Sequence, residues 1–205
     1  NWRPITLSNC DLKLITKTLM KRLTGVLEST IDQHQTAYMT GRSISDNIRL
    51  INWGVRTAQT QKKPFMVVAL DAMKAFDSVN HNIIEKALNW LGLKKIAKIF
   101  KILYENHVVD IVLKNSQIGR YNIKQGVKQG DSLSCILFIL IIEMLLKKIN
   151  RAGLRQHEWK KFKWPTAVGY ADDITLMLTN ERDMQTIIDI YAEFYKATGL
   201  KINAD

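Results

Sequence analysis

The stretch VGYADDITLML, residues 168–178, places two adjacent aspartates inside a run that otherwise favours a β-strand. Asp172 and Asp173 divide this run into two short strands, and Asp is well suited to the turn of a hairpin. A hairpin turn is therefore the simplest explanation of the pair. The alternative is a metal site, which needs a third carboxylate elsewhere in the chain and a substrate on which the metal can act.

A third candidate carboxylate, Asp71, follows the apolar run FMVVAL at residues 65–70. The Val-Val pair at the centre of that run is typical of a strand buried on both faces. If this strand pairs beside the Asp-Asp hairpin, Asp71 and Asp172 face each other across neighbouring strands. Carboxylates that lie so close together repel one another, and a hard cation such as Mg²⁺ is the usual reason for such a cluster.

The charge balance indicates a polyanionic partner. The 205 residues include 30 Lys and Arg against 19 Asp and Glu, which gives a formal net charge of +11. Nucleic acid is the simplest partner for a surplus of this size. Residues 147–163 carry seven of the basic residues and one acid, interleaved with or followed by Trp159, Phe162 and Trp164. Such a segment can follow a phosphate backbone and stack on bases, and a solvated helix end with a loop is the alternative.

Other features bear on the class of protein. Cys10 and Cys135 stand far apart without metal-ligand spacing, so we expect two buried thiols in a reducing compartment. The N-terminal residues lack the pattern of a signal peptide. The longest apolar run, residues 133–146, has 14 residues interrupted by Glu143, whereas a membrane span needs about 20. It predicts a buried helix. The missing initiator Met and the abrupt end at Asp205 lead us to expect a piece of a longer protein.

Helical periodicity predicts helices at residues 11–30, 43–60, 80–91, 94–107, 131–151 and 181–197. Ser43, and Asp131 or Ser132, are typical N-caps, and Gly199 is a typical C-cap. The stretches 108–114 and 119–124 predict an antiparallel hairpin. Strands and helices mix without strict alternation, which favours an α+β fold.

Six blocks in a fixed order decide between the two explanations of the aspartate pair. They read NWRPI, GRSISDNI, ALDAMKAFDSVNH, GVKQGDSLSCILF, GYADD and TGLKIN. This set resembles the reverse transcriptases of non-LTR (LINE-type) retrotransposons, and more loosely those of group II introns and telomerase. It implies a right-hand polymerase fold with fingers and palm, a small antiparallel palm sheet packed on helices, and no thumb. Residues 1–64 would belong to the fingers and residues 65–205 to the palm, with some fingers elements between about 80 and 125.

The resemblance assigns the aspartates to catalysis. It implies that Asp71 and Asp172 bind two Mg²⁺ ions, for which Mn²⁺ can substitute, and that the backbone carbonyl of Ala72 is a further ligand. Asp173 would assist at the metal near the primer end. The implied reaction adds deoxynucleoside triphosphates to a DNA primer on an RNA template.

The resemblance also implies contacts to the nucleotide and the nucleic acid. Phe76 matches an aromatic gate that excludes a ribose 2′-hydroxyl, with an ordinary core residue as the alternative. The other predicted nucleotide-binding residues are Arg3, the backbone of Met73, Lys74 and Ala75, and the pair Gln129 and Gly130. The predicted primer and template contacts are Arg42, Tyr170 and Ala171. For Arg42 the alternative is a solvated position at the start of a helix.

Some residues depart from the family pattern. Met73 stands where many relatives have Glu or Lys, Ser132 replaces a common proline, and the motif D lysine would follow the last residue of this chain. Asp71 and Asp77 also have the spacing seen in RNA-dependent RNA polymerases, but Phe76 opposes that use, and we expect Asp77 to organise the start of the next helix. Structural roles are expected for Glu143, His81 and Cys135.

The leading hypothesis is a reverse transcriptase fragment that serves retrotransposition. Its partners would be an RNA template, a DNA primer and deoxynucleotides, without a membrane, within a larger polyprotein that adds a thumb and an endonuclease. We expect an intracellular ribonucleoprotein in the cytoplasm and nucleus. The alternatives are a maturase-like or domesticated RNA-binding module without turnover, which the intact aspartates oppose, and an RNA-dependent RNA polymerase.

Overall fold

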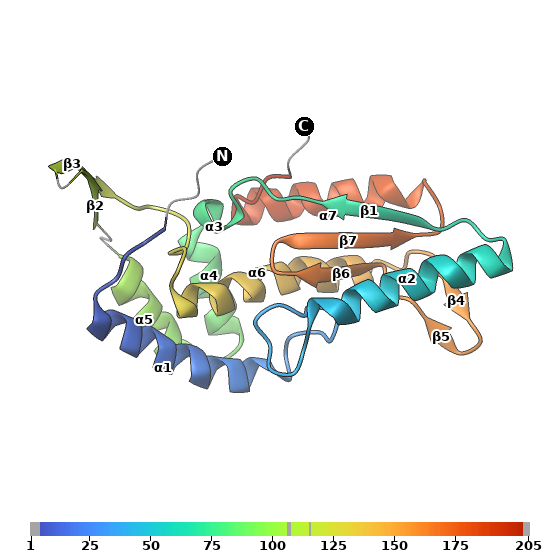
Figure 1. Ribbon diagram of the computed structural model, residues 1–205, viewed down its shortest axis with the longest axis horizontal. Coiled ribbons are helices and arrows are strands. Elements are labelled where there is room, and N and C mark those ends of the chain that lie inside the picture. Colours follow the sequence, from blue (N-terminus) through green and yellow to red (C-terminus); the bar gives the residue numbers. More distant parts are fainter. Residues whose placement is uncertain (1–4, 106–107, 115, 203–205) are drawn as a thin grey trace.

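The computed structural model describes residues 5–105, 108–114 and 116–202. Its helices are α1 (Cys10–Leu27), α2 (Ile44–Gln61), α3 (Ala75–Ser78), α4 (His81–Trp90), α5 (Lys94–Tyr104), α6 (Ser132–Asn150) and α7 (Asp183–Thr198). Its strands are β1 (Met66–Leu70), β2 (Val108–Leu113), β3 (Ser116–Asn122), β4 (Glu158–Trp159), β5 (Phe162–Lys163), β6 (Ala167–Tyr170) and β7 (Asp173–Leu178). The combination of helices with small antiparallel sheets confirms the α+β prediction (Figure 1).

One sheet carries the predicted aspartates. β7 lies between β1 and β6 and pairs antiparallel with both. Leu70 at the end of β1 pairs with Ile174, and Tyr170 at the end of β6 pairs with Asp173. The end of β1 and the turn between β6 and β7 therefore lie at the same end of the sheet (Figure 1). The strand pairing on which the metal hypothesis depends is present.

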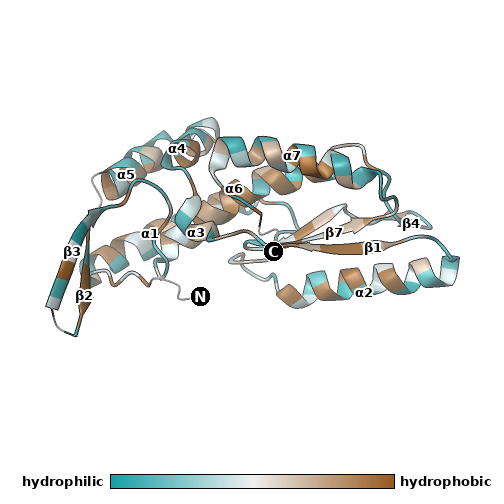
Figure 2. Ribbon diagram, turned by 90° about the horizontal axis from the view of Figure 1, so that it is seen from above, coloured by the Kyte–Doolittle hydropathy of each residue, from teal (hydrophilic) through white to brown (hydrophobic). Residues whose placement is uncertain are grey.

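Helices lie on both faces of this sheet, with α6 and α7 on one face and α2 along the other (Figure 2). Val68 and Leu176 point to the α6 side and join the main core. Val168 and Met177 point to the opposite side, where they pack with Trp164 and with residues of α2. The sheet is thus a layer between two apolar clusters.

α6 forms the centre of the main core. Thirteen of its 19 residues are buried, and α1, α4, α7 and β6 pack around it. A helix surrounded in this way needs apolar residues around most of its circumference, which explains the run at residues 133–146. The predicted buried helix is confirmed. Within the described ranges, no helix has the length and apolarity that crossing a membrane requires.

β1 is half exposed, so the prediction of a strand buried on both faces is wrong. Its residues alternate between partly buried and exposed, and Val67 is 44% exposed. The reason is its place at the edge of the sheet, while α2 packs against β6. An apolar run can have the same sequence whether one face or both are covered, because the covering element lies elsewhere in the chain.

Capping interactions explain several helix ends, and the predicted caps are confirmed. Ser43 and Asp46 form a capping box at the start of α2. The carboxylate of Asp131 accepts a hydrogen bond from the Ser134 amide at the start of α6. Gly199 ends α7 with φ of +81°.

The predicted hairpin is β2–β3, which projects beyond α5 (Figure 1). The β4–β5 hairpin was not predicted.

Candidate active site

The three predicted aspartates lie at one end of the β1–β7–β6 sheet. Asp71 directly follows β1, Asp172 occupies the turn between β6 and β7, and Asp173 is the first residue of β7. Because Leu70 pairs with Ile174, the chain at Asp71 continues beside that turn. Asp71 and Asp173 are exposed, and Asp172 is half-buried. Carboxylates from two neighbouring strands are thus open to a ligand.

The turn between β6 and β7 has an unusual backbone. Tyr170 pairs with Asp173, so Ala171 and Asp172 alone reverse the chain. Ala171 has φ of +56°, in the left-handed region that favours glycine. A residue with a Cβ keeps this conformation only where its surroundings fix it. The position of Asp172 therefore depends on the neighbours of the turn.

Two tyrosines lie near the aspartates. Burial raises the pKa of Tyr38 to about 12, and Cys135, Tyr170 and Asp172 add to the rise. Burial also raises the pKa of Tyr191 to about 12, with a contribution from Asp71. Both hydroxyls therefore stay protonated at neutral pH and add no negative charge beside the carboxylates.

The donor set fits a hard cation that also takes ligands from water and substrate. Within residues 5–105, 108–114 and 116–202, no group of three His, Cys, Asp or Glu side chains is arranged to hold a metal ion. Mg²⁺ commonly keeps several waters and is bound through one or two carboxylates and phosphate oxygens. Asp71, Asp172 and the Ala72 carbonyl would supply this small number of protein ligands. The remaining coordination positions would be left to water and substrate oxygens.

The segment after Asp71 is fastened to the end of the described chain. Ala72 forms an isolated antiparallel bridge with Ile202, and the Met73 amide donates a hydrogen bond of 2.8 Å to the Lys201 carbonyl. Lys74, with φ of +45°, is the N-cap of the short helix α3. The predicted contact of the Met73 amide with phosphate would require its bond to Lys201 to open. Lys74 is exposed and Ala75 is buried.

Phe76 belongs to the core and also reaches the surface. Its ring stacks on Phe138 of α6, with centroids 4.4 Å apart and an angle of 18° between planes. Phe138 is fully buried, whereas Phe76 is only half-buried. The stack fixes the ring in place, and the gate role stays a prediction.

The loop before α6 is tied to α3. Nε2 of Gln129 donates to Oδ1 of Asp77 at 3.0 Å, and the Val127 amide donates to the Phe76 carbonyl at 2.7 Å. Gly130 has φ of +94°, and a Cβ added there would come no closer than 3.5 Å to a neighbour. Its conformation, rather than crowding, therefore requires glycine. The next helix, α4, is capped by Asn80, so the predicted role of Asp77 at that helix start is wrong. Asp77 instead anchors Gln129.

Of the two arginines predicted to contact nucleotide or template, the structure describes only Arg42. Arg3 lies outside the described residues. The guanidinium of Arg42 donates to the backbone carbonyls of Asp32, Gln35 and Ile31. It closes the loop between α1 and α2, so the alternative of a solvated position is wrong. Its contact with template stays a prediction.

The loop between α1 and α2, residues 28–43, is a wall of the site that sequence reasoning missed. The Gly169 amide donates to the His34 carbonyl at 2.9 Å, and the Thr36 amide donates to the Gly169 carbonyl at 3.0 Å. The buried side chain of Gln35 bonds the backbone of Ala171. The only sequence signal is a short polar stretch, QHQT, which any surface loop can contain.

The basic and aromatic segment is more packed than predicted. Trp164 is 1% exposed and donates from Nε1 to the Leu50 carbonyl, so it is a core residue and its predicted stacking on bases is wrong. Trp159 and Phe162 remain partly exposed and contact Trp53 of α2, with centroids 6.3 and 4.8 Å apart. In this segment, Trp159 and Phe162 are the rings that remain accessible.

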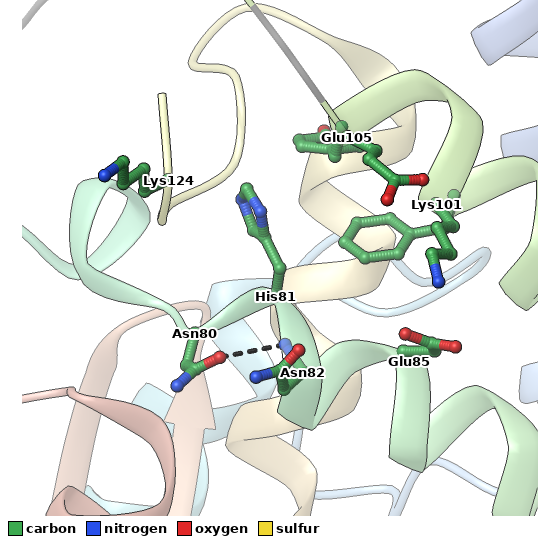
Figure 3. Close-up of a pocket in the computed structure, with 9 residues that line it drawn as sticks. Asn80, His81, Asn82, Glu85, Lys101, Glu105 and Lys124 are labelled. Atoms are coloured by element: carbon green, nitrogen blue, oxygen red, sulfur yellow. Dashed lines mark hydrogen bonds between the residues drawn. The ribbon is translucent and has the colours of Figure 1, made fainter. Parts of the chain in front are cut away.

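The residues expected to be structural have internal partners. Oε1 of Glu143 accepts from the Asp32 amide at 2.9 Å. Nε2 of His81 lies 2.7 Å from the Gly126 carbonyl. The thiol of Cys135 lies 3.7 Å from the Asp131 carbonyl. Cys135 is half-buried and Cys10 is exposed, so the prediction of two buried thiols is wrong. A polar cavity of about 310 Å³ lies beside His81, with Asn80, Glu85, Lys101, Glu105 and Lys124 around it (Figure 3). It contains none of the predicted site residues.

Comparison with protein families finds a match to the family described as "Reverse transcriptase (RNA-dependent DNA polymerase)" over residues 1–205. A Pol polyprotein of a type-1 retrotransposable element R2 from Popillia japonica is 32% identical over the whole chain, which spans 29% of that relative. The R2DM Pol polyprotein of Drosophila melanogaster is 26% identical over the whole chain, which spans 19% of it. A 149 kDa protein of transposon TX1 from Xenopus laevis is 27% identical over 99% of the chain and 16% of the relative.

Solved structures with a similar fold include telomerases. Telomerase from Candida albicans, in complex with a fragment of telomeric RNA, has a TM-score of 0.69 at 14% identity, over 94% of this chain and 33% of that one. Telomerase from Candida tropicalis in a similar complex has a TM-score of 0.63 at 16% identity, over 92% and 32%. At these identities the likeness concerns the fold alone.

Proposed function

Because the chain belongs to the reverse transcriptase (RNA-dependent DNA polymerase) family, we propose that it carries the nucleotidyl-transfer centre of an RNA-directed DNA polymerase. The observation that carries this proposal is the antiparallel pairing of β1 with β7, which brings the end carrying Asp71 beside the turn carrying Asp172. The chain spans about a third or less of the relatives, so this activity belongs to a larger polyprotein.

The proposed metal ligands are Asp71, Asp172 and the Ala72 carbonyl, with Asp173 assisting. Two Mg²⁺ ions, or Mn²⁺ in their place, would activate the primer hydroxyl and stabilise the leaving pyrophosphate. Asp71 follows β1 and Asp172 lies in the turn before β7, so the two carboxylates would approach the metals from different segments of the chain. The protonated hydroxyl of Tyr38 leaves the negative charge of this site to the aspartates.

The proposed nucleotide pocket lies between α3 and the loop before α6. Phe76 would pack under the sugar and exclude a 2′-hydroxyl, because its ring is fixed against Phe138. Gln129 and Gly130 would approach the base pair, and the Lys74 and Ala75 amides would face the triphosphate. Arg3 would contact the same phosphates.

We also propose the contacts to nucleic acid and the setting of the protein. RNA template and DNA primer would meet Tyr170 and Ala171 at the turn, with Arg42 as a further candidate. The exposed Lys160 and Lys161, next to the partly exposed Trp159 and Phe162, suit a strand with phosphates and bases. Residues 1–64 would act as fingers and 65–205 as palm, with fingers elements between about 80 and 125, completed by a thumb and an endonuclease. The polyprotein would work as a ribonucleoprotein in the cytoplasm and nucleus.

Primer extension on an RNA template, with Mg²⁺ and either deoxynucleotides or ribonucleotides, tests the proposal. The protein should extend with deoxynucleotides, and Asp172→Asn should lower the rate by at least about 10³-fold because the metals lose a ligand charge. The matched control is Asp189→Asn, since Asp189 is exposed on α7 and bonds only Gln185 among the contacts described. Tight RNA binding without extension by either nucleotide would instead support the non-catalytic module. Extension with ribonucleotides would support an RNA polymerase.

A further inference from the structure

We propose that Gln35 is a positioning residue that holds the turn carrying Asp172. Its expected effect on catalysis rests on the function proposed above, whereas its effect on the turn is a property of the fold. The proposal combines a buried amide, a backbone conformation that alanine disfavours, and a loop that is anchored on both sides of the amide.

Gln35 binds both backbone polar groups of Ala171. The side chain is fully buried. Its Oε1 accepts from the Ala171 amide at 3.2 Å and from the Ala37 amide at 3.1 Å, and its Nε2 donates to the Ala171 carbonyl at 3.4 Å. Two N–H donors converge on Oε1, which determines which end of the amide is oxygen. One side chain therefore spans the residue before Asp172.

The turn needs such a partner because of its conformation. Ala171 has φ of +56°, where its Cβ crowds the following carbonyl oxygen. Released from Gln35, Ala171 would relax toward negative φ and reorient the next residue, Asp172. A displacement of about 1 Å at a catalytic group can lower a rate by about 100-fold.

Gln35 can hold the turn because its own loop is fixed. Arg42 binds the carbonyls of Ile31, Asp32 and Gln35. The residues on either side of Gln35 bond the backbone of Gly169, and Asn47 donates to the Gly169 carbonyl at 2.9 Å. A Cβ added at Gly169 would lie 3.0 Å from Nε2 of Gln35 and 2.9 Å from Leu146. The absence of a side chain at Gly169 thus leaves room for the amide.

The direct test is amide hydrogen exchange of the segment 168–174 in the whole protein. Gln35→Met keeps the length of the side chain and removes both polar atoms, so exchange at Ala171 should become at least about tenfold faster. Gln33→Met is the matched control, because Gln33 lies in the same loop and is exposed. Unchanged exchange in Gln35→Met, or an equal change in both variants, overturns the proposal.

Primer extension then separates positioning from general damage. Gln35→Met should lower kcat about 10- to 100-fold while KM for the deoxynucleotide changes less than about threefold. Adding Ala171→Gly should restore part of the loss, because glycine adopts positive φ without strain. A defect confined to KM, or no recovery in the double variant, contradicts the positioning role.

Two further outcomes are distinguishable. If Gln35→Met does not fold, the same substitution is made together with Ala171→Gly, because glycine adopts positive φ without strain. Exchange of the residue-171 amide should then be faster than in Ala171→Gly alone, because the acceptor Oε1 is lost. If the unaltered protein does not extend primers under any condition, the proposed function fails, and the exchange measurement still decides the role of Gln35.

Discussion

Gln129 and Asp77 are joined by a hydrogen bond of 3.0 Å from Nε2 to Oδ1, although 52 residues separate them in the chain. Beside it, the Val127 amide donates to the Phe76 carbonyl. These bonds make the loop before α6 and the helix after Asp71 a single unit. The family resemblance implies a role in nucleotide binding for each of these two segments, and the hydrogen bonds join them.

This dependence predicts non-additive kinetics. Asp77→Ala and Gln129→Ala should each lower kcat/KM for the deoxynucleotide, and the double variant should lose less than the sum, with a coupling of about 1 kcal/mol. Asp77→Asn is the control, because its amide oxygen can still accept from Gln129. Single-nucleotide incorporation measures the unaltered protein, the three alanine variants and the control, and additive losses would show that the bond does not couple the two segments.

Gly126 predicts a separate effect on folding. It has φ of +84°, and a Cβ there would lie 2.6 Å from the backbone oxygen of Asp77. Gly126→Ala should therefore lower the free energy of unfolding by more than about 2 kcal/mol, through strain and a clash that backbone must relieve. Gly92→Ala is matched, because Gly92 has φ of +77° and open space around it, and only the strain of about 1 kcal/mol applies. Equal losses in urea unfolding would show that the clash is absent.

Sequence reasoning was most successful where local patterns determine the structure. Helical spacing predicted α1, α2, α4, α5, α6 and α7, and the caps at Ser43, Asp131 and Gly199 are local features. The ordered motifs indicated that Asp71 and Asp172 belong to one site. The pairing of β1 with β7 agrees with that interpretation.

The sequence was least informative where burial depends on distant segments. Gln35 acquires its contacts from Ala171, 136 residues away, and it lies between two periodic segments without belonging to either. From the sequence, Trp164 is a candidate for stacking on bases, but in the structure it is buried against α2. Val67 is a candidate core residue, but it is exposed because β1 lies at the edge of the sheet. In each case the local residues permit both outcomes, and tertiary contacts decide.

The stack of Phe76 on Phe138 predicts how sugar selection responds to mutation. Phe76→Ala removes the ring and should raise the ratio of ribonucleotide to deoxynucleotide kcat/KM by at least about tenfold, because the space for a 2′-hydroxyl opens. Phe138→Leu leaves the gate in place but loosens its support, so a smaller rise is expected. Competition between the two nucleotides in primer extension gives the ratio. If Phe76→Ala lowers stability and leaves the ratio unchanged, Phe76 is a core residue only.

Glu143 predicts a dependence of stability on pH. Burial raises the pKa of its carboxyl, against the opposing effects of the Asp32 amide and Lys147. Between the unfolded and the folded pKa the native state binds more protons than the unfolded state, so stability falls as pH rises through this window and stays lower above it. Glu143→Gln keeps an oxygen for the Asp32 amide and has no charge to bury. It should exceed the unaltered protein in stability by about 1 kcal/mol at pH 7.5, and the gain should shrink near pH 4.

Glu193 supplies a control for this prediction with the opposite sign. It is exposed on α7, and its hydrogen bond with Lys148 lowers the pKa of its carboxyl. A lowered folded pKa contributes stability above the unfolded pKa, and that contribution disappears as pH falls through the folded value. Glu193→Gln should therefore be slightly less stable than the unaltered protein at pH 7.5 and equal to it in acid. Urea unfolding at both pH values measures the two variants, and a loss of stability in Glu143→Gln at pH 7.5 would show that the ion pair with Lys147 outweighs the cost of burial.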